Sequence, residues 1–163
     1  IMNENIYNLA RQVGKALQRK KLLLTTAESC TGGLLATSIT DIPGSSIYFD
    51  CGFITYSNQS KHDLLAVKNS SLKKYGAVSE KIAQEMAQGA LKASNANIAI
   101  AITGIAGPSG ASKNKPLGTV CFAFASSKKS IKTTTIYFKG TRKSIKFQAV
   151  KFALTNLLDT IEL

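Results

Sequence analysis

The most constraining feature of the sequence is a nearly continuous apolar run from Asn97 to Ile102. A short run without polar alternation is typical of a strand that is buried on both faces, as in a parallel sheet covered by helices. This run ends in a glycine-rich segment, Thr103 to Pro108, and a second apolar run, Leu22 to Ala27, is followed closely by Gly32 and Gly33. Strands that alternate with helices in this manner predict an α/β fold.

The rest of the chain supplies the other elements of such a fold. Helical periodicity predicts helices, and short β-rich runs between turn residues predict strands. The expected helices cover residues 4–19, 34–39, 58–65, 80–94 and 142 to the end. The expected strands cover residues 22–27, 52–56, 97–102, 117–125 and 131–138, and the last two form an antiparallel hairpin. A loop is expected from residue 66 to residue 76. We therefore predict one domain, residues 1–163, built as a three-layer sandwich with a mixed sheet and helices on both faces.

Composition excludes several classes of protein. Apolar residues make up 44% and charged residues 18% of the 163 positions, which are proportions of a globular domain. The apolar runs are far shorter than the about 20 residues of a membrane span, so no membrane partner is expected. The chain start shows no secretory signal, and three widely spaced cysteines argue for a reducing compartment, which we expect to be the cytoplasm. The single histidine, His62, leaves too few ligands for a zinc site, so no metal is expected.

The charge is large and unevenly placed. The chain carries 21 Lys and Arg against 9 Asp and Glu, for a net charge of +12, and no acidic residue occurs between Glu85 and Asp159. Such a field favours an anionic partner. The lysines are spread over strands and a helix without interleaved aromatic residues, however, so nucleic acid is not the expected partner.

Polar clusters follow three of the predicted strands. They lie at Glu28 to Gly33, at Tyr56 to Lys61 and at Thr103 to Pro108. In open α/β sheets, ligands bind beyond the carboxyl ends of the strands. If the three strands are neighbours, the clusters meet in one crevice and form the candidate site.

Ser29 is the candidate nucleophile of this crevice. It stands between a buried strand and a helix that begins with two glycines, so its hydroxyl can project into the crevice. The N–H groups of Gly32 and Gly33 then suit an oxyanion or a phosphate. The plain alternative is that Ser29 or Thr31 only caps the following helix.

A nucleophilic serine needs a base, and the sequence offers Lys61 and His62. The two residues point about 100° apart on a regular helix, so only one of them faces the site. Lys61 can serve if burial or a nearby cation lowers its pKa toward about 7 to 8; its plain alternative is a solvated surface lysine. Tyr56 could relay a proton or orient Lys61, and its plain alternative is a packing residue with a solvated hydroxyl.

Cys30 competes with Ser29 as nucleophile, with His62 as its base. The period-2 alternation of a strand end predicts that Ser29 and Cys30 point to opposite faces, so that only one of them lies in the crevice. The alternative role of Cys30 is that of a small buried apolar side chain.

The loop Thr103 to Pro108 offers backbone N–H groups and a hydroxyl for a phosphate or a carbonyl oxygen. It lacks the spacing of a phosphate-binding Walker motif and of a dinucleotide-binding fingerprint, so no cofactor is expected. Arg142, at the start of the last helix, can bind an anion through two parallel hydrogen bonds.

These residues resemble the motifs of the CinA C-terminal domain family, which includes stand-alone nicotinamide-nucleotide amidases of the PncC type. The matching blocks occur in the family's order over about residues 6 to 160: Ala27 to Gly33, Tyr56 to Asn58 with Lys61 and Leu64-Leu65, Gly76 to Ser79, Met86-Ala87, Thr103 to Pro108, and Pro116 to Val120. The segment Gly110 to Lys115 departs from the family's usual pattern, and Lys146 stands where a second arginine is frequent after Arg142.

The resemblance implies an enzyme that hydrolyses the carboxamide of nicotinamide mononucleotide to nicotinic acid mononucleotide and ammonia, in pyridine-nucleotide salvage, without a metal or cofactor. It implies that Ser29 is the nucleophile, Lys61 its general base and Tyr56 a supporting hydroxyl. The residues that it implies in substrate binding are Glu28, Thr31, Gly32, Gly33, Thr103, Gly104, Gly107 and Arg142, the last near the phosphate. It also implies a homodimer or larger homo-oligomer.

Two other functions remain open at this point. The charge and the family's link to competence allow a non-catalytic module that associates with nucleotides or DNA. The altered segment from Gly110 to Lys115 allows a family member that kept the fold and lost catalysis.

Overall fold

The computed structural model describes residues 4–127 and 129–162. Its helices are α1 (Glu4–Arg19), α2 (Leu34–Thr40), α3 (Asn58–Leu65), α4 (Asn69–Tyr75), α5 (Glu80–Lys92) and α6 (Arg142–Glu162), with a 3₁₀ turn, η1 (Ser45–Ile47). Its strands are β1 (Leu24–Glu28), β2 (Phe49–Ile54), β3 (Ile98–Gly104), β4 (Thr119–Ser126) and β5 (Lys129–Tyr137). The predicted order of helices and strands is therefore correct apart from α4.

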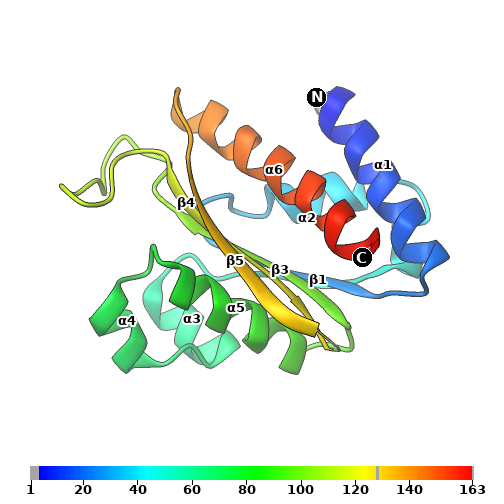
Figure 1. Ribbon diagram of the computed structural model, residues 1–163, viewed down its shortest axis with the longest axis horizontal. Coiled ribbons are helices and arrows are strands. Elements are labelled where there is room, and N and C mark those ends of the chain that lie inside the picture. Colours follow the sequence, from blue (N-terminus) through cyan, green and yellow to red (C-terminus); the bar gives the residue numbers. More distant parts are fainter. Residues whose placement is uncertain (1–3, 128, 163) are drawn as a thin grey trace.

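The strands form one mixed sheet in the order β2-β1-β3-β4-β5. Strand β1 pairs in parallel with β2 on one side and β3 on the other, and β4 and β5 continue the sheet as an antiparallel hairpin. Helices α1, α2 and α6 cover one face, and α3, α4 and α5 cover the other (Figure 1). The predicted α/β sandwich with a mixed sheet is confirmed.

The two faces of β3 pack against different partners. Ile98, Ile100 and Ile102 belong to the core that also includes residues of α1, α2 and α6, whereas Ala99 and Ala101 belong to the core formed with α5. All five side chains are buried, as the apolar run predicted. Because the α5 side of the strand carries only alanines, α5 can lie close to the sheet, and this fixes the loops at its two ends near the strand ends.

Helix α4 was predicted as a loop, and that prediction is wrong. Its seven residues carry one partly buried apolar side chain, Leu72, which is too little for a helical period. The helix is held by a tertiary contact: the buried carboxylate of Glu85 in α5 accepts bonds from Ser71 Oγ (2.7 Å) and from the N–H of Lys68 (2.9 Å). A sequence window contains no information about such a partner.

Two strand boundaries matter for the site. Strand β1 ends at Glu28, so the residues that follow it belong to a turn. Strand β2 ends at Ile54, two residues before its predicted end, because the backbone of Thr55 and Tyr56 turns toward α3. The β4–β5 hairpin has the predicted antiparallel pairing, and Lys128 lies outside the described residues. Among the described helices, none is long and apolar enough to cross a membrane.

Candidate active site

The three polar clusters meet at the carboxyl end of β1. The sheet places β1 between β2 and β3, so the segments that follow these three parallel strands lie side by side. They line a cavity of about 310 Å³, together with Arg142 from α6. Its lining residues include Ser29, Cys30, Tyr56, Asn58, Lys61, Ala77, Val78, Thr103, Gly104, Ile105, Gly107 and Ser109. The predicted common crevice is confirmed.

Ser29 is held at the bottom of this cavity by its own backbone. Its N–H donates to the carbonyl of Ile102 at the end of β3 (2.9 Å), and its carbonyl accepts from the N–H of Gly32 (3.0 Å). The side chain is 8% exposed. A buried serine at the end of a central strand is thus presented to the cavity by a tight turn.

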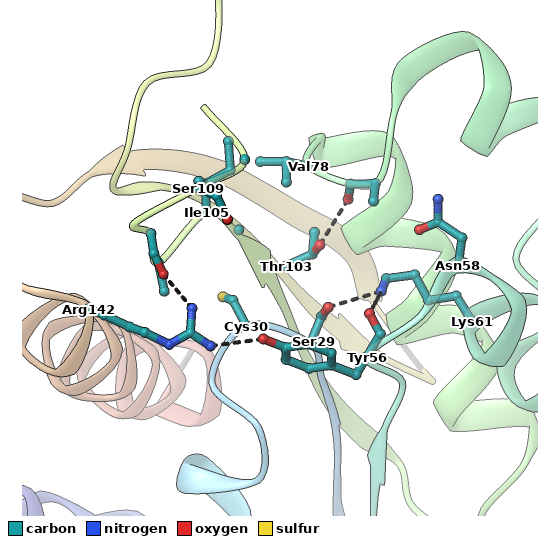
Figure 2. Close-up of a pocket in the computed structure, with 15 residues that line it drawn as sticks. Ser29, Cys30, Tyr56, Asn58, Lys61, Val78, Thr103, Ile105, Ser109 and Arg142 are labelled. Carbon is teal, nitrogen blue, oxygen red and sulfur yellow. Dashed lines mark hydrogen bonds between the residues drawn. The ribbon is translucent and has the colours of Figure 1, made fainter. Parts of the chain in front are cut away.

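Lys61 approaches Ser29 from α3. Ser57 caps this helix through its hydroxyl, which accepts from the N–H of Ser60 at 3.0 Å. Lys61 Nζ lies 2.9 Å from Ser29 Oγ, 2.7 Å from the carbonyl oxygen of Thr55 and 3.4 Å from that of Tyr56 (Figure 2). The lysine side chain is only 1% exposed. What looks in the sequence like a solvated surface lysine is therefore the largest fully buried side chain at the site.

His62 points away from the cavity. Its Nδ1 lies 2.9 Å from the carbonyl oxygen of Val67, at the far end of α3. The expectation that only one of the two neighbours faces the site is therefore correct, and Lys61 is the one that does. Among the described residues lining the cavity there is no histidine.

Burial lowers the pKa of Lys61 from 10.5 to about 8, because removal of the amine from water disfavours its charged form. The nearby Cys30 acts in the opposite direction. Of the two causes that the sequence allowed, burial and a nearby cation, burial is the one found in the structure.

Lys61 Nζ donates to Ser29 Oγ and to the carbonyl oxygens of Thr55 and Tyr56, which are the three bonds that a protonated amine can make. A neutral amine has two N–H groups and one lone pair. When Lys61 is neutral, the two carbonyl oxygens can keep the two N–H groups, and the lone pair is then directed to Ser29 Oγ at 2.9 Å, within the distance at which a general base takes a proton. This arrangement can deprotonate Ser29 without a histidine.

Cys30 also lines the cavity, so the prediction that it points away from Ser29 is wrong. Strand alternation does not apply because β1 ends at Glu28 and both residues lie in the turn. Burial, and next the negative charge of Glu28, raise the pKa of the Cys30 thiol to about 12. A thiol with this pKa stays protonated near neutral pH, which makes it a poor nucleophile.

The structure does not place Glu28, Thr31, Gly32 and Gly33 at the cavity, where the family resemblance implies that they bind the substrate. The N–H of Gly33 donates to the Glu28 carboxylate (3.1 Å), and that of Gly32 donates to the carbonyl of Ser29 (3.0 Å). None of these four is among the described residues that line the cavity. The helix cap is Gly33, which has no side chain to offer, so the alternative in which Ser29 or Thr31 caps α2 is wrong.

Arg142 and Tyr56 meet at the mouth of the cavity. The Arg142 guanidinium donates to the carbonyl of Gly107 (2.6 Å) and to the Tyr56 hydroxyl (2.9 Å). The Tyr56 ring is 59% exposed, and its hydroxyl does not contact Lys61; its backbone carbonyl does. Figure 2 shows the guanidinium lying across the opening from Lys61, with Ser29 between them.

Thr103 lies at the wall of the cavity near the segment between α4 and α5. Its hydroxyl donates to the carbonyl of Ala77 (2.9 Å). Sequence reasoning from the residues missed Ala77 and Val78 as lining residues, although the block Gly76 to Ser79 in the family resemblance pointed to them. It also missed the carbonyl of Thr55, for which no side-chain signal exists because the acceptor is backbone.

Metal ligands are not assembled in the described part of the chain. Residues 4–127 and 129–162 contain no group of three or more His, Cys, Asp or Glu side chains placed to hold one ion.

Comparison with known proteins gives the family. A model of the CinA C-terminal domain matches residues 6–161. The chain belongs to the CinA C-terminal domain family. It is 48% identical over 155 residues to a protein of Enterobacter agglomerans named nicotinamide-nucleotide amidohydrolase PncC, covering 95% of this chain and 94% of that protein. It is 52% identical over 125 residues to the protein of the same name from Escherichia coli K12, covering 77% and 76%.

Solved structures of this family share the fold. The crystal structure of the competence/damage inducible protein CihA from Agrobacterium tumefaciens matches with a TM-score of 0.95 at 40% identity, covering 100% of this chain and 99% of the other. The resemblance predicted from the motifs is thus confirmed over the whole domain.

Proposed function

We propose that this protein is a nicotinamide-nucleotide amidohydrolase, which converts nicotinamide mononucleotide and water to nicotinic acid mononucleotide and ammonia. The observation that carries the proposal is the 2.9 Å contact between Ser29 Oγ and a buried Lys61 Nζ whose pKa is lowered to about 8. The names of the Enterobacter and Escherichia relatives support the substrate.

The proposed reaction has two halves. Ser29 Oγ attacks the carboxamide carbon while Lys61 takes the hydroxyl proton, and Lys61 then gives this proton to the nitrogen that leaves as ammonia. The product of this half is a nicotinoyl ester on Ser29. In the second half Lys61 takes a proton from a water molecule that attacks the ester carbon, and returns it to Ser29 Oγ as the acid is released.

Arg142 is the residue that we assign to the substrate phosphate. A guanidinium has five N–H donors, and its two hydrogen bonds to Gly107 and Tyr56 leave others for an anion. Arg142 also lines a second hollow with Lys143 and Lys146, so the positive charge continues beyond the cavity mouth. Thr103, Gly104 and Gly107 also line the cavity and are proposed to contact the nicotinamide and ribose.

The decisive test is ammonia release from nicotinamide mononucleotide, with and without a chelator. Wild-type protein should turn over in both conditions, and Ser29→Ala should lose about a thousandfold or more in kcat. Cys30→Ala is the matched control in the same turn, and it should keep most of the activity. Activity that survives in Ser29→Ala and disappears in Cys30→Ala would reverse the choice of nucleophile, and a wild type without turnover would refute the proposed substrate.

The setting of the enzyme is part of the proposal. We propose that residues 1–163 act as a single domain in the cytoplasm, as a homodimer or larger homo-oligomer. Cys30, Cys51 and Cys121 are all free thiols in the structure, in keeping with a reducing compartment. Light scattering of the purified protein tests the oligomeric state.

A further inference from the structure

The carboxylate of Glu28 is completely buried next to the nucleophile, and four groups donate to it. Oε2 accepts from the Thr31 hydroxyl at 2.6 Å and from the N–H groups of Gly33 and Leu35, each at 3.1 Å. Oε1 accepts from the N–H of Ala36 at 2.8 Å. The side chain has no exposed surface, and Glu28 does not line the cavity.

These four donors come from the turn that carries Ser29 and from the start of α2. Gly33 lies at φ +95° and has no side chain to satisfy the N–H groups of the first helical turn. The carboxylate of Glu28, at the end of β1 and five residues earlier, accepts the N–H of Gly33 in place of a cap side chain. This hydrogen bond closes the segment from Glu28 to Gly33 into a loop.

Ser29 is part of this loop, and both its backbone N–H and its carbonyl are hydrogen-bonded. Its N–H is fixed on Ile102, its carbonyl is fixed by Gly32, and the Glu28 to Thr31 hydrogen bond spans the same few residues. Loss of that bond removes one of the contacts that shape the turn, whereas Lys61 is held separately on α3. The distance affected is the 2.9 Å contact between Ser29 Oγ and Lys61 Nζ.

We propose that Glu28 is a positioning residue for Ser29, acting through the Thr31 hydroxyl without touching the substrate. This inference rests on the proposed role of Ser29 as nucleophile. It replaces the substrate-binding role that the family resemblance implied for Glu28 and Thr31.

A carboxylate is required at this position. All four groups that face it are donors, and an ionised carboxylate is the one side-chain group of this size that only accepts. In Glu28→Gln the amide NH₂ faces at least one of these donors. Because that variant also disturbs the start of α2, the milder change at Thr31 is the better probe.

The experiment compares Thr31→Val, which keeps the shape and removes the hydroxyl, with Thr31→Ser, which keeps the hydroxyl. Displacement of a nucleophile by as little as 1 Å can cost about a hundredfold in rate. We expect kcat for nicotinamide mononucleotide to fall at least about tenfold in Thr31→Val with KM within about twofold, and Thr31→Ser to restore kcat to within about threefold of wild type.

Ser38→Ala is the control for the loss of a buried hydroxyl outside the turn. Ser38 is fully buried in α2, and its hydroxyl donates to the carbonyl of Leu34 at 2.7 Å. This variant should keep kcat, and thermal unfolding of both variants shows how far each change affects stability. A Thr31→Val variant that is less stable than wild type but keeps kcat would overturn the inference, as would a rise in KM alone or a Thr31→Ser variant as slow as Thr31→Val.

A second readout separates this inference from the proposed function. A fluorophosphonate that labels activated serines reports the reactivity of Ser29 without a substrate, and labelling is located by mass spectrometry with Ser29→Ala as the blank. Slower labelling of Thr31→Val than of Thr31→Ser supports the positioning role even if nicotinamide mononucleotide is not turned over. Equal labelling rates in the two variants refute it, whatever the substrate.

Discussion

The pH dependence of the reaction tests the chemistry of Lys61 most directly. The general base must be neutral, and burial lowers the pKa of Lys61 from 10.5 to about 8. At pH 7.5 an amine with a pKa of 8 is about 24% neutral, whereas an ordinary lysine is about 0.1% neutral. Burial of this side chain, which is 1% exposed, thus increases the population of the neutral form by about 240-fold at this pH. The lower basicity of the amine offsets part of this gain, because general-base efficiency follows Brønsted behaviour.

The expected profile follows from the same pKa. From pH 6.8 to pH 9 the neutral fraction rises from about 6% to about 91%, so kcat/KM should rise about fifteenfold and level off above pH 9. The substrate phosphate, with a second pKa of about 6, is already ionised from pH 6.8 to pH 9. Ammonia release at fixed ionic strength measures the profile, and Lys61→Met should lack both the activity and the rise. A flat profile, or a midpoint near that of a free lysine, would refute the assignment of Lys61 as base.

The same titration must appear in protein stability. The pKa of Lys61 is lower in the folded state than in the unfolded state, so between pH 8 and 10.5 the unfolded chain binds more protons. Stability contributed by this group therefore rises with pH, by about 3 kcal/mol in total and by about 1 kcal/mol between pH 7 and pH 9. Urea unfolding of wild type and Lys61→Met at the two pH values isolates this group. A difference between the two proteins that does not change with pH would contradict the burial of a titrating amine.

Two further predictions concern the phosphate and the packing of α5. Arg142→Gln should raise KM for nicotinamide mononucleotide about tenfold or more, since charged hydrogen bonds to a phosphate are strong. The same variant should change the turnover of nicotinamide riboside, which has no phosphate, much less. An equal loss on both substrates would contradict a phosphate contact. Gly89→Ala should destabilise the fold by about 1–3 kcal/mol in urea unfolding in spite of the better helix propensity of alanine, because the added Cβ would lie 2.0 Å from the carbonyl oxygen of Leu65. Gln88→Ala, one residue earlier and exposed, is the matched control.

The parts of the fold that periodicity describes were predictable. The burial of β3 on both faces, the amphipathic helix α1 and the hairpin of β4 and β5 all follow from local patterns that the chain carries in each element. Helix α4 was missed because its support is the Glu85 carboxylate of α5. The orientation of Cys30 was wrong because one residue decides whether strand alternation or turn geometry applies.

The main residues of the candidate site were predictable from the sequence, but only some of their contacts were. Strand ends and glycines indicated Ser29, Lys61 and Arg142, and the 100° between successive helical residues indicated that Lys61 and His62 could not both face the cavity. The sequence did not reveal that the Tyr56 hydroxyl contacts Arg142 rather than Lys61, or that Glu28 is enclosed by its own turn.

The sequence by itself determined the order of helices and strands, the family and the residue types at the strand ends, because these depend on local period and on short motifs. Only the tertiary structure decided what those residues do. Lys61 is suited to the proposed role of base because α3, β1 and the segment after β2 together remove its amine from water and bring Ser29, 32 positions away, to 2.9 Å. Solvation and distance depend on which segments meet in space, and no single stretch of the chain contains that information.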